Sequence, residues 1–205
     1  MFHVKHEGLR AAAADLRVTL DGTQTDRLER FEDLLRERAA ALGMIARNDL
    51  TRLRERHVLD SLRAAPALPE AVRSVLDLGS GAGLPGIPVA IARPDLAVTL
   101  SETRHQRIAF LELVVTELGL SHVSVHAGRA EDAPGPFEAC LARAFRDAAG
   151  SWTVSRKLLR PQGCLVYFAG ARFDVARDVP AGVAASVAPT SSLANAGPLV
   201  IMTRK

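Results

Sequence analysis

The residues with the clearest chemical potential form a glycine-rich stretch, DLGSGAGLPG, at positions 77–86. Glycine has no Cβ, so the backbone can turn tightly against a ligand, and a helix that starts there offers free N–H groups. Gly79, Gly81 and Gly83 have the G-x-G-x-G spacing of S-adenosylmethionine enzymes. Gly81, Gly83 and Gly86 have the G-x-G-x-x-G spacing of dinucleotide enzymes. The turn therefore indicates an adenine nucleoside and leaves its type open.

Acidic residues near this turn help to decide between S-adenosylmethionine and a dinucleotide as the ligand. Glu102 follows the glycines at the distance (~20 residues) where an acid binds ribose hydroxyls, which both ligands carry. Asp77 adjoins the turn, where a carboxylate repels a pyrophosphate but attracts an ammonium or sulfonium group. Ala130 and Glu131, within the stretch GRAED, suit the edge of an adenine. These features favour S-adenosylmethionine as the cofactor.

The elements that must position these residues alternate between strand and helix. We expect strands at 74–78, 97–100, 123–127, 139–142, 164–168, 182–187 and 199–203, and helices at 84–92, 104–118 and 148–159. This alternation predicts an α/β fold with a doubly wound, Rossmann-like parallel sheet. The last two strands have no helix between them, so an antiparallel edge is expected in place of a second nucleotide-binding half.

The residues before this unit predict a helical extension. Leu28, Phe31, Leu35 and Leu42 recur at helical spacing within 24–43, and Thr23 with Asp26 resembles a capping box. A second helix is expected over 49–63. We therefore expect a poorly structured N-terminus (1–22), a helical extension (23–68) and a methyltransferase domain (69–205).

The amino-acid composition limits the classes of protein to which this chain can belong. The chain has 205 residues, 48 % hydrophobic and 24 % charged, which is typical of a globular domain and excludes wholesale disorder. No apolar run reaches the ~20 residues that span a bilayer, so a cytoplasmic protein without a membrane partner is expected. Cys140 and Cys164 lie in apolar stretches and are expected to be buried thiols, and no metal-ligand spacing is present.

Charge is distributed unevenly along the chain. Residues 64–142 carry 5 Lys and Arg against 9 Asp and Glu, whereas residues 143–205 carry 9 against 3. A basic stretch is either a solvated surface or a contact with a polyanion such as RNA. Seven of these basic residues lie between Arg143 and Arg177, and we expect some of them to flank the mouth of the site.

Several motifs together resemble one known family. DLGSGAGLPGIP at 77–88, RAE at 129–131, ARAF at 142–145 and RHVLDSL at 56–62 are similar to segments of the bacterial 16S rRNA guanine-N7 methyltransferases, also called glucose-inhibited division protein B. The resemblance covers about residues 25–205. It implies a class I S-adenosylmethionine-dependent methyltransferase that methylates N7 of one guanosine in 16S rRNA. The partner would be 16S rRNA or the small ribosomal subunit, and no stable protein partner is expected.

The resemblance also implies roles for individual residues. Gly79, Leu84, Arg143 and the backbone at 130–131 would contact the cofactor, with Glu102 at its ribose. Asp77 and Gly81 complete the cofactor residues that we infer from the turn itself. This sequence departs from the family at Gln106 and at Ala169-Gly170, where lysine and lysine-glycine are common. These positions are expected on surfaces that face RNA or at the edge of the pocket.

Four residues are candidates for substrate contact: Asn48, His57, Arg129 and Arg146. Asn48 is equally suited to a helix cap, His57 to packing, and Arg129 to a surface ion pair. Arg143 would clamp the cofactor carboxylate or the target nucleotide, or else pair with Glu131 or Asp77. No catalytic base is expected, because N7 of guanine carries no proton.

Two other functions remain open at this point. A small-molecule methyltransferase would have a narrow pocket with its basic residues facing away from it. A non-catalytic, S-adenosylmethionine-binding ribosome-assembly factor would keep the cofactor site without transferring a methyl group. A nicotinamide dehydrogenase is disfavoured by the acid beside the glycine turn.

Overall fold

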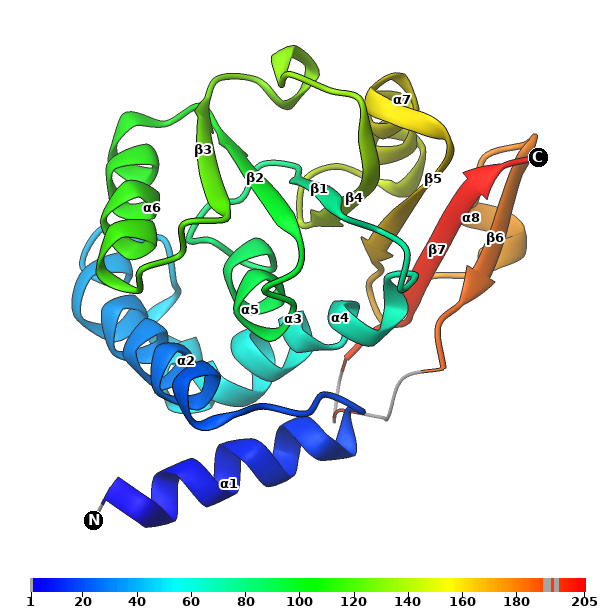
Figure 1. Ribbon diagram of the computed structural model, residues 1–205. Helices are drawn as coiled ribbons and strands as arrows, with labels where there is room; N and C mark the ends of the chain where they lie inside the picture. The colour runs from blue at the N-terminus through cyan, green and yellow to red at the C-terminus, as the bar shows by residue number, and fades with distance from the viewer. Residues whose placement is uncertain (1, 190–192, 194–195) are drawn as a thin grey trace.

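Seven strands form one mixed sheet in the order β3-β2-β1-β4-β5-β7-β6 (Figure 1). The computed structural model describes residues 2–189, 193 and 196–205. The strands are β1 Ser74–Asp77, β2 Ala97–Glu102, β3 Val123–Ala127, β4 Phe137–Arg143, β5 Leu159–Phe168, β6 Val183–Val187 and β7 Leu199–Arg204. Strands β1 to β5 pair in parallel, and β7 is antiparallel to β5 and β6. The predicted doubly wound sheet with an antiparallel edge is confirmed.

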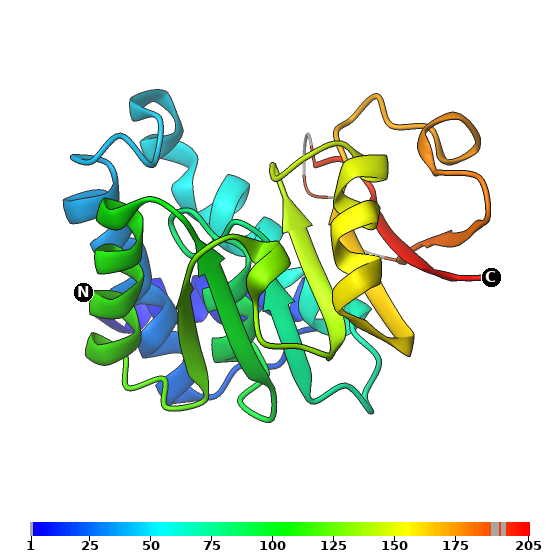
Figure 2. The same cartoon turned by 90° about the horizontal axis from the view of Figure 1, so that it is seen from above.

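Helices cover both faces of this sheet. They are α5 Gly86–Ala92, α6 His105–Glu117, α7 Ala148–Leu158 and α8 Val175–Asp178, with a short 3-10 helix η4 at Ala130–Asp132. Successive side chains of a strand point to opposite faces, so Val75 packs into the core under α5 and α6 while Leu76 packs into the core under α7. Because β1 to β5 run in parallel, their carboxyl ends meet at one edge of the sheet (Figure 2).

The two cysteines illustrate the two cores. Cys140 and Cys164 are free and buried on neighbouring strands. Cys140 belongs to the core under α7, and Cys164 to the core on the other face. Burial raises the pKa of the Cys164 thiol to about 11. The prediction of buried thiols is confirmed.

The N-terminus differs from the expectation for residues 1–22. Helix α1 spans Phe2–Asp15, and the backbone then runs to α2. Leu9 and Ala13 are fully buried, and Leu16, Val18 and Leu20 are at most 5 % exposed, so this segment adds its own apolar face to the core. The expectation of a poorly structured N-terminus was wrong, because these apolar side chains find a surface of the folded body to pack against.

Several helical segments, most of them short, lie between α1 and β1. They are α2 Gly22–Leu34, η1 Leu35–Ala39, η2 Arg47–Arg52, η3 Arg54–Leu59, α3 Asp60–Leu62 and α4 Ala64–Ala67. Leu28, Phe31 and Leu35 are buried as predicted, but Leu42 is 45 % exposed. The capping box at the start of α2 is formed by Asp21 and Gln24, and not by the expected Thr23 and Asp26.

Candidate functional site

The glycine turn joins β1 to α5 at the carboxyl edge of the sheet. Gly79, Gly81 and Gly83 have φ angles of +66°, +58° and +83°, in the left-handed region that favours glycine. At Gly86 a Cβ would lie only 2.4 Å from Leu100 Cδ2, so glycine lets α5 pack directly on the sheet. The backbone path of the turn therefore depends on all four glycines.

A cavity of about 240 Å³ lies beside this turn. Loops that follow β1, β2, β3 and β4 contribute to its wall. Its lining consists of Gly79, Ser101, Glu102, Thr103, Gly128, Arg129, Ala130, Glu131, Phe145 and Arg146. Six of the residues predicted for the site thus lie together in one wall. Asp77, Gly81, Leu84, Asn48, His57 and Arg143 are outside this lining.

Glu102 is held as a carboxylate at the end of β2. It is 6 % exposed, and its oxygens accept hydrogen bonds from the backbone N–H groups of Thr103 (2.8 Å), Arg104 (3.0 Å) and Gly81 (3.1 Å). Arg107 Nη1 lies 3.5 Å from Oε2. Burial alone raises the pKa of Glu102, but these donors and the arginine outweigh it, so its pKa lies below the ordinary value. The cavity therefore presents a fixed, ionised acceptor.

Asp77 ends β1 directly beneath the turn and is 1 % exposed. Its Oδ2 accepts the backbone N–H of Gly86 at 3.0 Å, whereas Oδ1 has no hydrogen-bond partner among the described residues. Burial raises the pKa of Asp77 to about 7, although the Ser80 hydroxyl and then the Gly86 N–H act in the opposite direction. A cation placed nearby would stabilise the ionised form.

This pKa predicts a pH-dependent effect of Asp77→Asn on stability. A carboxyl group whose pKa rises on folding stabilises the fold when protonated, and this contribution is lost as pH rises through the folded pKa. Asparagine keeps an acceptor for Gly86 and has no charge to bury. Without ligand, the free energy of unfolding of the variant should exceed that of the parent chain by an amount that grows with pH. The difference should be near zero at pH 4 and about 4 kcal/mol at pH 8. Thermal unfolding at several pH values measures this difference, at roughly 2–4 °C per kcal/mol.

Asp95→Asn is the matched control. Asp95 is exposed and pairs with Arg93, and this hydrogen-bonded pair lowers the pKa of Asp95. The control should therefore lose a little stability, or none, above pH 5. An Asp77→Asn chain whose stability follows that of the parent at every pH would contradict the assigned protonation of Asp77.

Arg143, the last residue of β4, binds the helical extension. Its Nη2 donates to the backbone oxygen of Arg56 (2.8 Å) and to His57 Nδ1 (3.1 Å), and its Nη1 lies 3.4 Å from Ser61 Oγ. Its Nε is 3.4 Å from Asp60 Oδ2. The alternative of an ion pair with Glu131 or Asp77 is not seen among the described residues, because Asp60 and the extension occupy the guanidinium, and Asp77 acts on it only through its charge.

The other substrate candidates separate into two groups. Arg129 and Arg146 both pair with Glu131, at 3.3 and 2.8 Å, on the rim of the cavity. The Arg146 guanidinium also stacks 4.8 Å from the centre of the Phe145 ring. His57 lies against Arg143, and burial followed by the charge of Arg143 lowers its pKa. Asn48 is exposed on η2 and does not cap a helix that the structure describes.

Four residues of the lining were not among those predicted from the sequence, Ser101, Thr103, Gly128 and Phe145, and two of them contact the glycine turn. Ser101 Oγ donates to the backbone oxygen of Asp77 (2.8 Å) and accepts the N–H of Gly79 (3.1 Å), so it joins β2 to the turn. Phe145 packs on Gly79, where an added Cβ would lie 2.8 Å from the ring. A hydroxyl within an otherwise apolar strand was a signal for Ser101. Nothing local distinguishes Phe145 from a core residue.

Comparison with known proteins identifies the family. Residues 24–175 match the family described as rRNA small subunit methyltransferase G. The ribosomal RNA small subunit methyltransferase G of Ralstonia nicotianae is 38 % identical over 176 residues, which cover 81 % of this chain and 78 % of that protein. The protein of the same name from Sorangium cellulosum is 38 % identical over 82 % of this chain and 73 % of its own.

The chain belongs to the rRNA small subunit methyltransferase G family. Solved structures of lower identity share its fold. One is the O-methyltransferase TomG of Streptomyces achromogenes in complex with SAM, with a TM-score of 0.58 and 18 % sequence identity. The superposition covers 97 % of this chain and 96 % of the TomG chain. The Podospora anserina methyltransferase PaMTH1 has a TM-score of 0.58 and 12 % identity, with 88 % of each chain covered. The predicted class I methyltransferase fold is confirmed.

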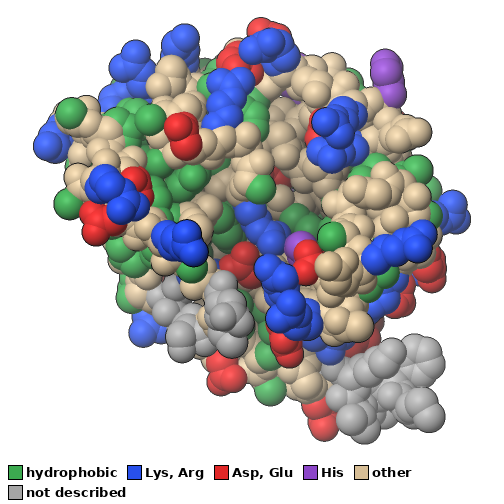
Figure 3. Space-filling model, turned by 180° about the vertical axis from the view of Figure 1, so that it is seen from behind, with side chains coloured by type: hydrophobic (Ala, Val, Ile, Leu, Met, Phe, Trp, Pro, Cys, Tyr) green, Lys and Arg blue, Asp and Glu red, His purple; other side chains and the backbone are tan. Residues whose placement is uncertain are grey.

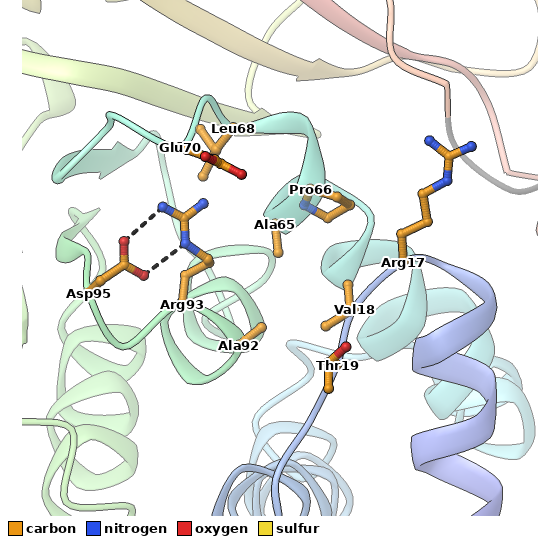
Figure 4. Close-up of a pocket in the computed structure, with 10 residues that line it drawn as sticks. All are labelled: Arg17, Val18, Thr19, Ala65, Pro66, Leu68, Glu70, Ala92, Arg93 and Asp95. Atoms are coloured by element: carbon orange, nitrogen blue, oxygen red, sulfur yellow. Dashed lines mark hydrogen bonds and ion pairs between the residues drawn. The ribbon is translucent and has the colours of Figure 1, made fainter.

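A larger hollow in this methyltransferase lies at the opposite edge of the sheet, with a volume of about 540 Å³ (Figure 4). There the guanidinium of Arg93 donates two hydrogen bonds to the carboxylate of Asp95, each 2.8 Å long. None of the predicted site residues lines this hollow. The size of a cavity therefore does not locate the site in this fold.

No described helix is long and apolar enough to cross a membrane. No three His, Cys, Asp or Glu side chains within the described ranges come together as a possible metal site.

Proposed function

We propose that this protein transfers the methyl group of S-adenosylmethionine to N7 of one guanosine in 16S rRNA. The observation that carries the proposal is the cavity beside the glycine turn, with the ionised Glu102 in its wall, in a chain of the rRNA small subunit methyltransferase G family. The family supports the RNA substrate, and the cavity supports an adenosine-containing cofactor. A cytoplasmic location follows from such a substrate.

The residues present fit this cofactor. Glu102 offers carboxylate oxygens to two ribose hydroxyls, and the carboxylate is already fixed by backbone donors. The unpartnered Oδ1 of the buried Asp77 suits the positive charge of the ammonium or sulfonium group. We assign Gly79, Gly81, Leu84, Ala130, Glu131 and Arg143 to the remaining cofactor contacts.

Bound S-adenosylmethionine supplies an electrophilic methyl carbon on a sulfonium. The lone pair of guanine N7 forms the new N–CH₃ bond while the S–CH₃ bond breaks, and its electron pair stays on sulfur. N7 loses no proton, so the protein needs no general base. The described residues serve this displacement by holding N7 in line, about 3 Å from the methyl carbon, and by excluding water. His57, Asn48, Arg129 and Arg146 are assigned to the RNA side of this arrangement.

Transfer of a labelled methyl group tests the proposal. The full chain is incubated with labelled S-adenosylmethionine and with small ribosomal subunits or naked 16S rRNA that lack the modification. Label in 16S rRNA is expected. Label only in small molecules would indicate a small-molecule methyltransferase. Binding of S-adenosylhomocysteine without any transfer would indicate a non-catalytic assembly factor. Both results would contradict the proposal.

A further inference from the structure

A segment of the extension projects past the carboxyl ends of the strands. We name residues 41–52 the arginine arm; it lies between η1 and η3 and includes η2, a 3-10 helix without any buried residue. Figure 2 shows the arm in light blue beyond the strand ends. Ile45, 5 % exposed, and the fully buried Leu53 anchor its base. Between Ile45 and Leu53 the chain is exposed except for the half-buried Asp49 and Leu50.

Two arginines of the arm have no acidic partner. Arg47 and Arg52 are exposed, and neither forms an ion pair with any residue that the structure describes. The next arginines in the chain differ, because Arg54 pairs with Glu32 at 2.8 Å and Arg56 pairs with Asp49 at 2.7 Å. An exposed, unpaired guanidinium keeps all of its N–H donors for a partner.

The arm lies next to the candidate site. The backbone oxygen of Arg56 accepts a hydrogen bond from Arg143 at the end of β4, and Arg56 in turn binds Asp49 of the arm. Figure 3 looks onto this edge of the molecule, where acidic, basic and histidine side chains line a central hollow with more basic side chains around it. A nucleic acid that places a base at the end of β4 would pass close to the arm.

The basic residues of the C-terminal part divide between the two edges of the sheet. Arg143 and Arg146 lie at the carboxyl edge, whereas Arg156 and Lys157 lie at the end of α7, where β5 begins. Arg160 is also at that far edge and pairs with Glu138 at 3.0 Å. Part of the basic stretch predicted to flank the site therefore faces the opposite edge, and the arm adds positive charge to the carboxyl edge beside Arg143.

We propose that the arginine arm binds the phosphate backbone of rRNA next to the target nucleotide, through Arg47 and Arg52. This inference rests on the proposed function and names a docking surface for its substrate. Guanidinium groups bind phosphates through two parallel hydrogen bonds, and such contacts position RNA without reading its sequence. Leu42 is the large apolar side chain exposed on the arm, which is little for a hydrophobic protein interface. The charge of the arm thus favours RNA over a protein partner.

The double variant Arg47→Gln/Arg52→Gln tests this surface. Each lost phosphate contact lowers the slope of log K against log salt by about 0.7–0.9, so the slope should fall by roughly 1.4–1.8. Affinity for small ribosomal subunits should drop about tenfold at 0.15 M salt. Binding of S-adenosylhomocysteine should remain unchanged, because neither arginine lines the cavity.

Arg156→Gln/Lys157→Gln is the matched control, since it removes the same charge from the opposite edge. It should leave the salt slope within error of the parent value. An arm variant that behaves like this control, while the parent chain methylates rRNA, would overturn the inference and leave the proposed function standing. Weaker binding with an unchanged salt slope would assign the arm to a ribosomal protein and would also overturn it. A parent chain that labels no rRNA would overturn the proposed function itself.

Discussion

Replacing Glu102 with glutamine should weaken binding of S-adenosylhomocysteine by at least about 100-fold. Two ribose hydroxyls would lose their charged acceptor, at about 1.5–3 kcal/mol for each hydrogen bond. The glutamine amide would also direct an N–H donor at the backbone N–H of Gly81, which Glu102 Oε2 now accepts at 3.1 Å. The turn would then shift as well. Isothermal titration calorimetry on the full chain measures the effect.

Glu131→Gln is the control for this loss. Glu131 lines the same cavity, but its carboxylate pairs with Arg129 and Arg146 on the rim. Only its backbone is assigned to the cofactor, so affinity should change by less than about threefold. Thermal unfolding checks that both variants remain folded. Equal affinities in the Glu102 and Glu131 variants would show that the cavity does not bind the ribose through Glu102.

Replacing Arg143 with alanine should reduce methyl transfer by at least about 100-fold, because small displacements of reacting groups carry losses of that size. The change removes the contacts with the backbone of Arg56, with His57 and with Asp60 that hold the extension against β4. The Arg143→Lys variant should not restore the rate, since one ammonium group cannot reproduce the planar set of N–H donors of a guanidinium. Single-turnover transfer to 16S rRNA measures the step.

Arg160→Ala is the matched control for Arg143. Arg160 pairs with Glu138 at the opposite edge, so its loss should leave transfer close to the parent rate. Calorimetry with S-adenosylhomocysteine then separates the two roles proposed for Arg143. Loss of affinity would support the assigned cofactor contact, whereas retained affinity would show that Arg143 acts through the extension or on the RNA. Full transfer activity in Arg143→Ala would contradict both roles.

The part of the cavity wall formed by the glycine turn and Glu102 is predictable from the sequence because local rules specify it. Glycine spacing fixes the turn, and the acid that ends β2 must reach it, since β1 and β2 pair in parallel with Asp77 opposite Leu100. Register and strand direction thus bring Gly79 and Glu102 together without detailed knowledge of packing. The same reasoning predicts the antiparallel edge, because the chain between β6 and β7 is too short for a crossover helix.

The remainder depends on tertiary contacts that no local pattern encodes. Arg143 pairs with Asp60, 83 positions earlier, only because the extension folds over the face of β4 that this side chain occupies. Helix α1 lacks a distinctive pattern, and it is ordered by the burial of Leu9 and Ala13 against the body. The capping box forms at Asp21 because the helix begins two residues earlier than the Thr23 pattern predicts.

The most direct test of the account is chemical cleavage of 16S rRNA after reaction with this protein. Borohydride followed by aniline cuts RNA at N7-methylguanosine, and primer extension locates the cut. One new cleavage site is expected, at a guanosine, that appears only with active protein and S-adenosylmethionine and is lost with Arg143→Ala. Methyl label in the rRNA without a cleavage site would show that another atom is methylated, and this would contradict the central claim.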